Sequence, residues 1–376
     1  MLAVATFALA ARLAAPALAA DEAPSDPAAT AADAAAVEAL VRKHLAAPRP
    51  TKADYPDLRR RDVVTVLVLG DSGVAAGLGP VAQAAADVCF SGKGPACDLA
   101  VLVGDNVYEV GIETPGAAAW VDAFATPMAP FSSHAAGPAR FRAWVVAGNH
   151  DWGHGTDAAG AGRVAAALAT TDHPANAAIG GLWRYPALAY RVPGLPRWLN
   201  LHGVDTELIV RGKGAAVLDA TAAAMKRTRG WDVVFGHHAP VTTGVHGRDD
   251  DERDDEVWAA ALETLRPAGL SLVLAGHDHH QEVLESAGVP VIIQGNSSKG
   301  RDVGPTKYTP CSRWVRGGKP ARGFAVASFR EDRVDVTFYD AAGAPVHTAG
   351  WARAAGSGAA PPFGSCPAAP PAESPK

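Results

Sequence analysis

The chain has 376 residues, of which 48% are hydrophobic and 19% are charged, and its formal net charge is −5. These values are typical of globular proteins with enough apolar material for a sizeable core. The negative net charge argues against a nucleic-acid partner, because proteins that bind nucleic acids normally carry a basic face. An anionic substrate stays compatible with it, because bound metal cations can dominate the local field.

The first twenty residues have the pattern of a secretion signal. An apolar stretch ends in Ala-Leu-Ala at residues 17–19, and two acidic residues follow. Because no basic residue precedes the apolar run and Arg12 interrupts it, an alanine-rich helix or tail is the alternative interpretation. We predict a signal peptide over residues 1–20 and therefore a secreted or periplasmic protein. No later stretch reaches the ~18 apolar residues that a membrane span needs.

Two further segments flank the predicted main domain, which we place at residues 61–350. Residues 21–60 form an N-terminal extension in which Val37, Leu40, Val41 and Leu45 recur at helical spacing, so one amphipathic helix is expected there. Residues 351–376 are rich in Pro and Ala and are predicted to be a tail, because they cannot bury enough surface to fold.

The four cysteines are consistent with export, since disulfides persist in oxidising compartments. Cys89 and Cys97 flank a short Gly/Pro loop, and we predict a local disulfide between them. For Cys311 and Cys366 two interpretations stay open, a second disulfide or a Cys366 that lies in the tail. Free thiols are the alternative for all four.

One pattern recurs along the main domain: an aliphatic run leads into glycine, and a polar residue follows at once. The runs are VTVLVLGD (64–71), LAVLVGDN (99–106), AWVVAGNHD (143–151), WDVVFGHH (231–238) and LSLVLAGHDHH (270–280). Uninterrupted apolar runs suit strands that are buried on both faces. Because ligands bind at the carboxyl ends of strands in open α/β sheets, we expect these polar residues to share one site.

Other segments complete the predicted architecture. Ala-rich stretches at 80–88, 157–170 and 214–228 can supply crossover helices, and residues 289–298 are a candidate sixth strand. Residues 323–330 and 332–340 alternate as in an antiparallel hairpin, which a second mixed or antiparallel sheet would accommodate.

The polar blocks at the strand ends resemble a known family. GDSG (70–73), GDNVY (104–108), GNHD (148–151), GHHAP (236–240) and GHDH (276–279) resemble the ordered motifs of the metallophosphoesterases, and most closely those of the small purple acid phosphatases. The resemblance covers about residues 62–345. It implies an α/β fold of the metallo-dependent phosphatase type, a four-layer α/β/β/α sandwich of two mixed β-sheets flanked by helices.

The resemblance also implies a dinuclear metal centre. Two metal ions about 3.5–4 Å apart can clamp a phosphoryl group, and a carboxylate is the natural bridge between them. Asp105 would be this bridge. The implied metal ligands are Asp71, Asp105, Tyr108, Asn149, His237, His277 and His279. In an extended segment His277 and His279 face the same way while Asp278 turns aside.

Tyr108 bears on the choice of metals. Many metallophosphoesterases carry a histidine ligand where this chain has Gly73, and Tyr108 would supply a phenolate in its place. A hard anionic oxygen favours a trivalent ion, so we expect Fe(III) together with a divalent metal, which is Fe, Zn or Mn. A centre with divalent ions alone is the alternative.

The expected reaction is hydrolysis of small phosphate monoesters, as in an acid phosphatase, with a metal-bound hydroxide attacking phosphorus in line. By resemblance, the outer histidines His150 and His246 hold the phosphate and protonate the leaving group. A phosphodiesterase or nucleotide hydrolase on the same scaffold is one alternative. A non-catalytic metal- or phosphate-binding protein is another.

The remaining polar residues have structural interpretations. His238 and His280 are expected to face away from the site or line its rim, and Asp205 is a candidate partner behind the ligands. The acidic run at 249–256 lacks the spacing of a calcium loop and is predicted to be a solvated helix start. The other histidines are predicted to lie on the surface or in loops: His134, His154, His173, His202 and His347.

Overall fold

The computed structural model describes residues 27–47, 51, 54–92, 96–137, 139–226, 230–248, 253–353 and 362–366. The predicted signal peptide and most of the predicted tail lie outside these residues. Among the described residues, no helix combines the length and the apolar content that crossing a membrane requires.

The described strands form two mixed seven-stranded sheets. The first has the order β14 (Pro345–Ala352), β13 (Arg333–Asp340), β12 (Gly323–Phe329), β1 (Val64–Leu69), β2 (Leu99–Val103), β3 (Ala143–Val146) and β4 (Trp183–Arg184). The second has the order β11 (Ser312–Arg316), β9 (Gln281–Ser286), β10 (Val289–Gln294), β8 (Leu270–Ala275), β7 (Trp231–Phe235), β6 (Leu199–Val204) and β5 (Ala189–Arg191).

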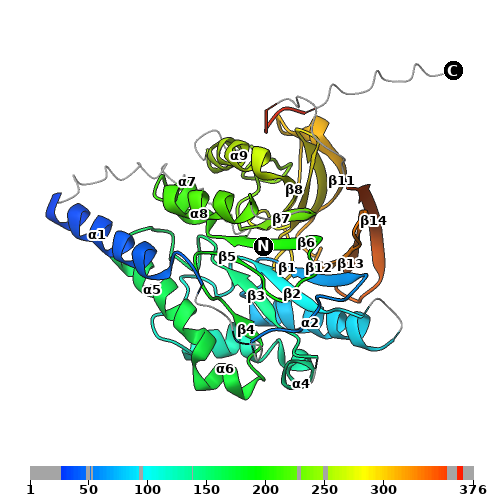
Figure 1. Cartoon of the computed structure of the whole chain (residues 1–376), viewed down its shortest axis with the longest axis horizontal. Coiled ribbons are helices and arrows are strands. Elements are labelled where there is room, and N and C mark those ends of the chain that lie inside the picture. Colours follow the sequence, from blue (N-terminus) through cyan, green and yellow to red (C-terminus); the bar gives the residue numbers. More distant parts are fainter. Residues whose placement is uncertain are drawn as a thin grey trace, which may run out of the picture.

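Helices cover the outer faces of both sheets (Figure 1). On the side of the first sheet lie α2 (Ala75–Phe90), α4 (Ser132–Ala136), α5 (Ala158–Ala169) and α6 (Pro174–Ala178). On the side of the second lie α7 (Thr206–Val210), α8 (Ala215–Met225) and α9 (Asp254–Leu265). A three-residue helix, α3 (Ala118–Trp120), precedes a short π-helical turn at Val121–Ala125. The predicted four-layer sandwich is therefore confirmed.

The strands that carry the polar blocks are buried along their length, as their apolar sequences predict. Every residue of β1, β2, β3 and β7 is buried. β1 pairs in parallel with β2, β2 with β3, and β7 with β8, so their carboxyl ends meet at one edge of each sheet. Between the sheets, the Tyr190 hydroxyl donates to the Val145 carbonyl at 2.7 Å, and Trp231 Nε1 donates to the Arg330 carbonyl at 2.8 Å.

The distribution of strands between the sheets differs from the prediction. The predicted hairpin exists as β12 and β13, but β12 pairs antiparallel with β1 and extends the first sheet. The five strands with polar blocks are instead divided, with β1–β3 in the first sheet and β7 and β8 in the second. Alternation along a segment indicates a strand but not its partner, so the sequence could not assign the hairpin to a sheet.

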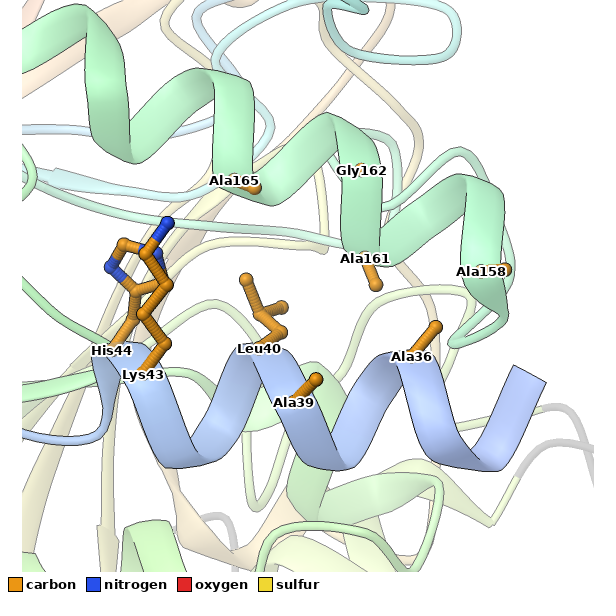
Figure 2. Close-up of a pocket in the computed structure, with 9 residues that line it drawn as sticks. All are labelled: Ala36, Ala39, Leu40, Lys43, His44, Ala158, Ala161, Gly162 and Ala165. Atoms are coloured by element: carbon orange, nitrogen blue, oxygen red, sulfur yellow. The ribbon is translucent and has the colours of Figure 1, made fainter. Parts of the chain in front are cut away.

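The predicted N-terminal helix is α1 (Pro27–His44), which lies along α5 (Figure 2). Val37 and Leu40 are buried against the domain, and the Ala158 amide donates to Asp33 Oδ1 at 3.0 Å. Between the two helices runs an apolar groove of about 260 Å³, lined by alanines together with Leu40, Lys43, His44 and Gly162. None of the predicted metal ligands lines this groove, so it is separate from the site described below.

Both cysteine pairs form disulfides, Cys89–Cys97 and Cys311–Cys366. The second one fastens residues 362–366 to the domain, where Phe363 is buried. The last strand, β14, also extends two residues beyond the predicted domain end at 350. These parts of the predicted tail are thus structured.

We predict that the two disulfides contribute unequally to stability. They close segments with sequence separations of 55 and 8 residues, and loop-closure entropy predicts losses of ~4 and ~2.5 kcal/mol when the long and the short bridge are removed. Urea unfolding of the Cys311→Ser/Cys366→Ser and Cys89→Ser/Cys97→Ser variants measures both losses. A larger loss for the short bridge would contradict this entropic explanation.

Candidate metal centre

The loops that follow β1, β2, β3, β7 and β8 converge where the carboxyl ends of the two sheets meet. At three predicted ligands the backbone is left-handed, with φ of 54° at Asp71, 53° at Asp105 and 70° at His277. For residues other than glycine this conformation costs about 1–2 kcal/mol each. Such strain persists only where the surrounding structure enforces it, and it concentrates at functional sites.

A first group of donor atoms surrounds the Tyr108 hydroxyl. This oxygen lies 2.8 Å from Asp105 Oδ2, 3.2 Å from Asp71 Oδ1 and 3.2 Å from His279 Nε2. His279 Nε2 and Asp71 Oδ1 are also 3.2 Å apart. Four side chains from three different loops therefore present one atom each to a common centre.

A second group surrounds His237 Nε2. This nitrogen lies 3.0 Å from Asn149 Oδ1, 3.1 Å from His277 Nδ1 and 3.4 Å from Asp105 Oδ1. Asp105 thus belongs to both groups, with Oδ2 in the first and Oδ1 in the second. The structure brings together all seven residues that the sequence predicts as ligands.

The second group is chemically consistent with a cation. His237 Nδ1 lies 2.9 Å from the Val103 carbonyl, which can only accept, so the ring proton is on Nδ1. Burial lowers the pKa of His237, and the neutral ring therefore directs the lone pair of Nε2 at the Asn149 and Asp105 oxygens. The lone pair of Nε2 and the oxygens of Asn149 and Asp105 are acceptors that face one another, an arrangement that a bound cation would stabilise. Histidine ligands are commonly oriented by such a carbonyl.

The first group is also consistent with a cation, as the pKa values of its members indicate. Burial raises the pKa of Asp71 to about 6 and, together with the charge of Asp71, that of Asp105 to about 6. Burial and the neighbouring carboxylates raise the pKa of the Tyr108 phenol well above its ordinary value. Burial and Arg301 lower the pKa of His279 to about 3. The interior thus favours neutral groups here, and a cation would replace the protons of these oxygens.

Asp151 is a supporting residue that the sequence interpretation missed. Its carboxylate is buried and accepts hydrogen bonds from the backbone amides of Asn106, Val107 and Gly148, at 3.1, 3.2 and 2.9 Å. It therefore ties the loop after β2 to the loop after β3. A Cβ at Gly148 would collide with the Asp105 carboxylate, so glycine is required there. The signal was present, because Asp151 is the last residue of the GNHD block.

Asp205, which was predicted to support the ligands by hydrogen bonds, contacts residues that are not ligands themselves. Its carboxylate accepts from Trp152 Nε1 at 3.1 Å and from the Tyr185 hydroxyl at 3.3 Å. The neighbouring Thr206 hydroxyl oxygen contacts the site more directly, since it accepts from the backbone amide of His237 at 3.1 Å.

Both predicted outer histidines border the two donor groups. His150 donates its backbone amide to Asp105 Oδ1 at 3.1 Å, and its Nε2 lies 3.8 Å from Asp105 Oδ2. His246 stacks on His277 with ring centroids 3.9 Å apart. Its Nε2 lies 3.2 Å from an Arg301 guanidinium nitrogen.

Two cations at the rim were not predicted. The Lys299 ammonium lies 3.5 Å from the centroid of the Tyr108 ring and 3.3 Å from Glu109 Oε1. Arg301 is the second, through its contact with His246. Both follow β10, the predicted sixth strand, and the basic pair in SSKGR (297–301) was the signal that could have indicated them.

Several polar residues differ from their predicted surroundings. His202 was predicted at the surface or in a loop, but it is buried in β6 with Nε2 2.8 Å from Asp232 Oδ1. Asp254 and Asp255, predicted to be solvated, are also buried, because Arg211 and Lys307 lie against them. His154 is exposed as predicted, yet its ring contacts that of His150 with centroids 4.2 Å apart.

Comparisons with known proteins agree with this geometry. A family model described as calcineurin-like phosphoesterase matches residues 64–281. Purple acid phosphatase 17 of Arabidopsis thaliana is 30% identical over 121 residues, which are 31% of this chain and 34% of that protein. The match thus spans about a third of the length of this curated relative.

Two solved structures share the fold. GAP50, the anchor in the inner membrane complex of Plasmodium, has a TM-score of 0.59 at 16% identity, over 78% of this chain and 90% of that chain. The purple acid phosphatase PPD1 from yellow lupin (Lupinus luteus) seeds has a TM-score of 0.55 at 15% identity, over 79% and 55% of the two chains. At these identities the likeness concerns the fold alone.

We predict that metal affinity falls steeply below pH 6. The raised pKa values mean that Asp71 and Asp105 hold protons below about pH 6, and each proton that a cation displaces lowers the apparent affinity about tenfold per pH unit. Calorimetric titration of the full chain with Zn²⁺ at pH 5 and pH 7 measures the difference. The Asp105→Asn variant, which lacks one of the two protons, should show a shallower dependence; equal affinities of the unmodified chain at both pH values would contradict the prediction.

Proposed function

The chain belongs to the calcineurin-like phosphoesterases, and on that basis we propose that it hydrolyses phosphate monoesters at a dinuclear metal centre, as a purple acid phosphatase does. The resemblance predicted from its five polar blocks is confirmed at the level of the family. One observation carries the proposal: the donor atoms form two groups of four that share the Asp105 carboxylate.

Each group would hold one metal ion. Asp71, Tyr108, His279 and Asp105 Oδ2 would bind the first, and Asn149, His237, His277 and Asp105 Oδ1 the second. The phenol oxygen in the first group supports Fe(III) at that position, because hard anionic oxygen favours a trivalent ion. The imidazole nitrogens of the second group suit a divalent Fe, Zn or Mn ion. Such a pair supplies an acidified water as nucleophile and polarises the phosphoryl oxygens.

His150 is the proposed proton donor to the leaving group. Its Nδ1 lies 2.7 Å from the Glu109 carbonyl, which orients the ring with Nε2 toward the Asp105 carboxylate. Burial lowers the pKa of His150. A donor with a lowered pKa holds its proton at acid pH and loses it as the pH rises, so turnover that depends on this proton should be favoured in acid.

The rim cations favour a monoester over a diester. A phosphate monoester carries up to two negative charges, whereas a diester carries one. Arg301 and Lys299, which also pairs with the exposed Glu109 carboxylate, place positive charge beside the donor groups, next to His246 and Tyr108. His246 contacts Arg301 and would help to hold the phosphate with it. A second negative charge on the substrate would therefore be stabilised here.

The two disulfides and the predicted signal peptide support a place of action outside the cytoplasm. Disulfides that staple a domain persist in secreted and periplasmic proteins and are rare in reducing compartments. Neither Cys89–Cys97 nor Cys311–Cys366 contributes to the donor groups, which fits a structural role.

We expect the Asp105→Ala variant to lose metal pairing and turnover together. Only this side chain belongs to both donor groups, so its removal should leave fewer than two ions per chain and lower kcat for an aryl phosphate by at least about a hundredfold, as the loss of a major transition-state contact does. Metal analysis and the aryl phosphate assay measure both effects. Asp232→Asn, which alters a buried carboxylate paired with His202, is the matched control and should retain both ions. Full activity of Asp105→Ala, or preference for a diester in the unmodified chain, would contradict the proposal.

Tyr108→Phe tests the choice of metal. Removal of the phenol oxygen should abolish the visible absorption expected from phenolate-to-iron charge transfer and weaken Fe(III) binding. Absorption spectra and iron analysis of the two proteins report this directly. A colourless, iron-free and fully active unmodified chain would show that the centre uses divalent ions alone.

A further inference from the structure

A second cluster of metal-binding side chains lies on the far side of His277 from the donor groups. It comprises His238 after β7, Asp254 at the start of α9 and His277 itself. Glu207 in α7 adjoins it through His238. α7 and α9 contact one another (Figure 1), which brings the two carboxylates together. The exposed fractions are 0% for Glu207, 1% for His238, and 8% for both Asp254 and His277.

The spacing of these atoms suits a tetrahedral cation. His238 Nε2 lies 3.4 Å from Glu207 Oε2 and 3.7 Å from Asp254 Oδ2. Ligand atoms of His238, Asp254 and His277 all lie within 4.8 Å of one another. Zinc–ligand distances of about 2.0–2.2 Å place tetrahedral ligand atoms about 3.3–3.6 Å apart. The contacts of His238 Nε2 are therefore close to this spacing, and a complete shell would require the four side chains to draw closer together.

Three of these atoms lack hydrogen bonds. Within the described part of the chain, His238 Nε2, His277 Nε2 and Glu207 Oε2 are buried and have no hydrogen-bond partner, although the first and the last are in contact. A buried polar atom left in this state is unfavourable, because it has lost its hydrogen bonds to water without replacing them. Three such atoms in one buried cluster favour a bound ligand there.

The surrounding residues orient the cluster as in a metal site. Arg211 donates from Nε to Glu207 Oε1 at 3.0 Å and from a terminal nitrogen to Asp254 Oδ1 at 2.9 Å. The other oxygens of the two carboxylates are the ones that lie 3.4 and 3.7 Å from His238 Nε2. Thr206 Oγ1, 2.9 Å from His238 Nδ1, fixes the other side of that ring. Such outer contacts position histidine and carboxylate ligands around metals.

We propose that His238 Nε2, Glu207, Asp254 and His277 Nε2 bind one Zn²⁺, a third cation beside the two of the proposed dinuclear centre. Two imidazole nitrogens and two carboxylate oxygens are a suitable shell for zinc. One guanidinium against two carboxylates leaves one negative charge for the ion to neutralise, and the ion would share the charge of a deprotonated His277 ring with the second metal. His277 Nδ1 faces His237, so its ring would join the third site to the second metal, and binding at both nitrogens releases the last proton of the ring.

The test counts metal ions on the full chain. The protein is loaded with the pair of metals, dialysed against buffered free Zn²⁺, and analysed for metal content and thermal unfolding. We expect three ions per chain in the unmodified protein, two in His238→Asn and Glu207→Gln, and a Zn²⁺-dependent rise in Tm that both variants lose. His202→Asn, which removes another buried histidine paired with a carboxylate, is the matched control and should bind three.

The Asp105→Ala variant separates this inference from the proposed function. Asp105→Ala should lose both ions of the dinuclear centre but retain one Zn²⁺ at the third site. The double variant Asp105→Ala/His238→Asn should lose this Zn²⁺ as well. Circular dichroism establishes that each variant is folded, and Glu207→Gln, which preserves side-chain shape, stands in if His238→Asn does not fold. No more than two ions on the unmodified chain, or three ions on folded Glu207→Gln, would overturn the third site.

Discussion

A single carboxylate is the point on which the site depends. Asp105 directs one oxygen to the Tyr108 hydroxyl and the other to His237 Nε2. Tyr108 follows a strand of the first sheet, whereas His237 follows a strand of the second. The Asp105 side chain can reach both groups only if the two sheets are held in one relative position. The sandwich as a whole therefore determines the geometry of the donor atoms.

The means of holding Asp105 are visible in the backbone around it. The backbone of Asp105 itself is left-handed, and its carboxylate accepts a hydrogen bond from the backbone amide of His150. Gly148 has no side chain and so leaves room for this carboxylate. Asp151 binds the two neighbouring loops to each other through backbone amides. These contacts fix the carboxylate before any cation arrives, which reduces the ordering cost of metal binding.

Much of the fold and of the site could be predicted because local patterns specify them. Aliphatic runs that end in Gly and a polar residue are consecutive in sequence, and they identify both the strand and the donor at its end. Asp151 and Lys299 were missed for a different reason. Asp151 lies within the GNHD block and Lys299 within a basic pair, but each acts through contacts between segments that are remote in sequence, and the local pattern does not specify those contacts. The burial of His202 and Asp254 was missed likewise, since each is buried beside a charged partner from another element.

The order of strands in the first sheet bears on when the site can form. β12, at residues 323–329, is the direct neighbour of β1, at residues 64–69, and the whole second sheet is encoded between β4 and β12. During synthesis β1 can pair with β2 early, but its antiparallel partner β12 is made only after every proposed ligand. Pairings between such distant segments are slow, because a long loop must close before the contact forms. Since the donor groups draw on loops of both sheets, we expect the complete site to form only after this long-range pairing and the packing of the two sheets.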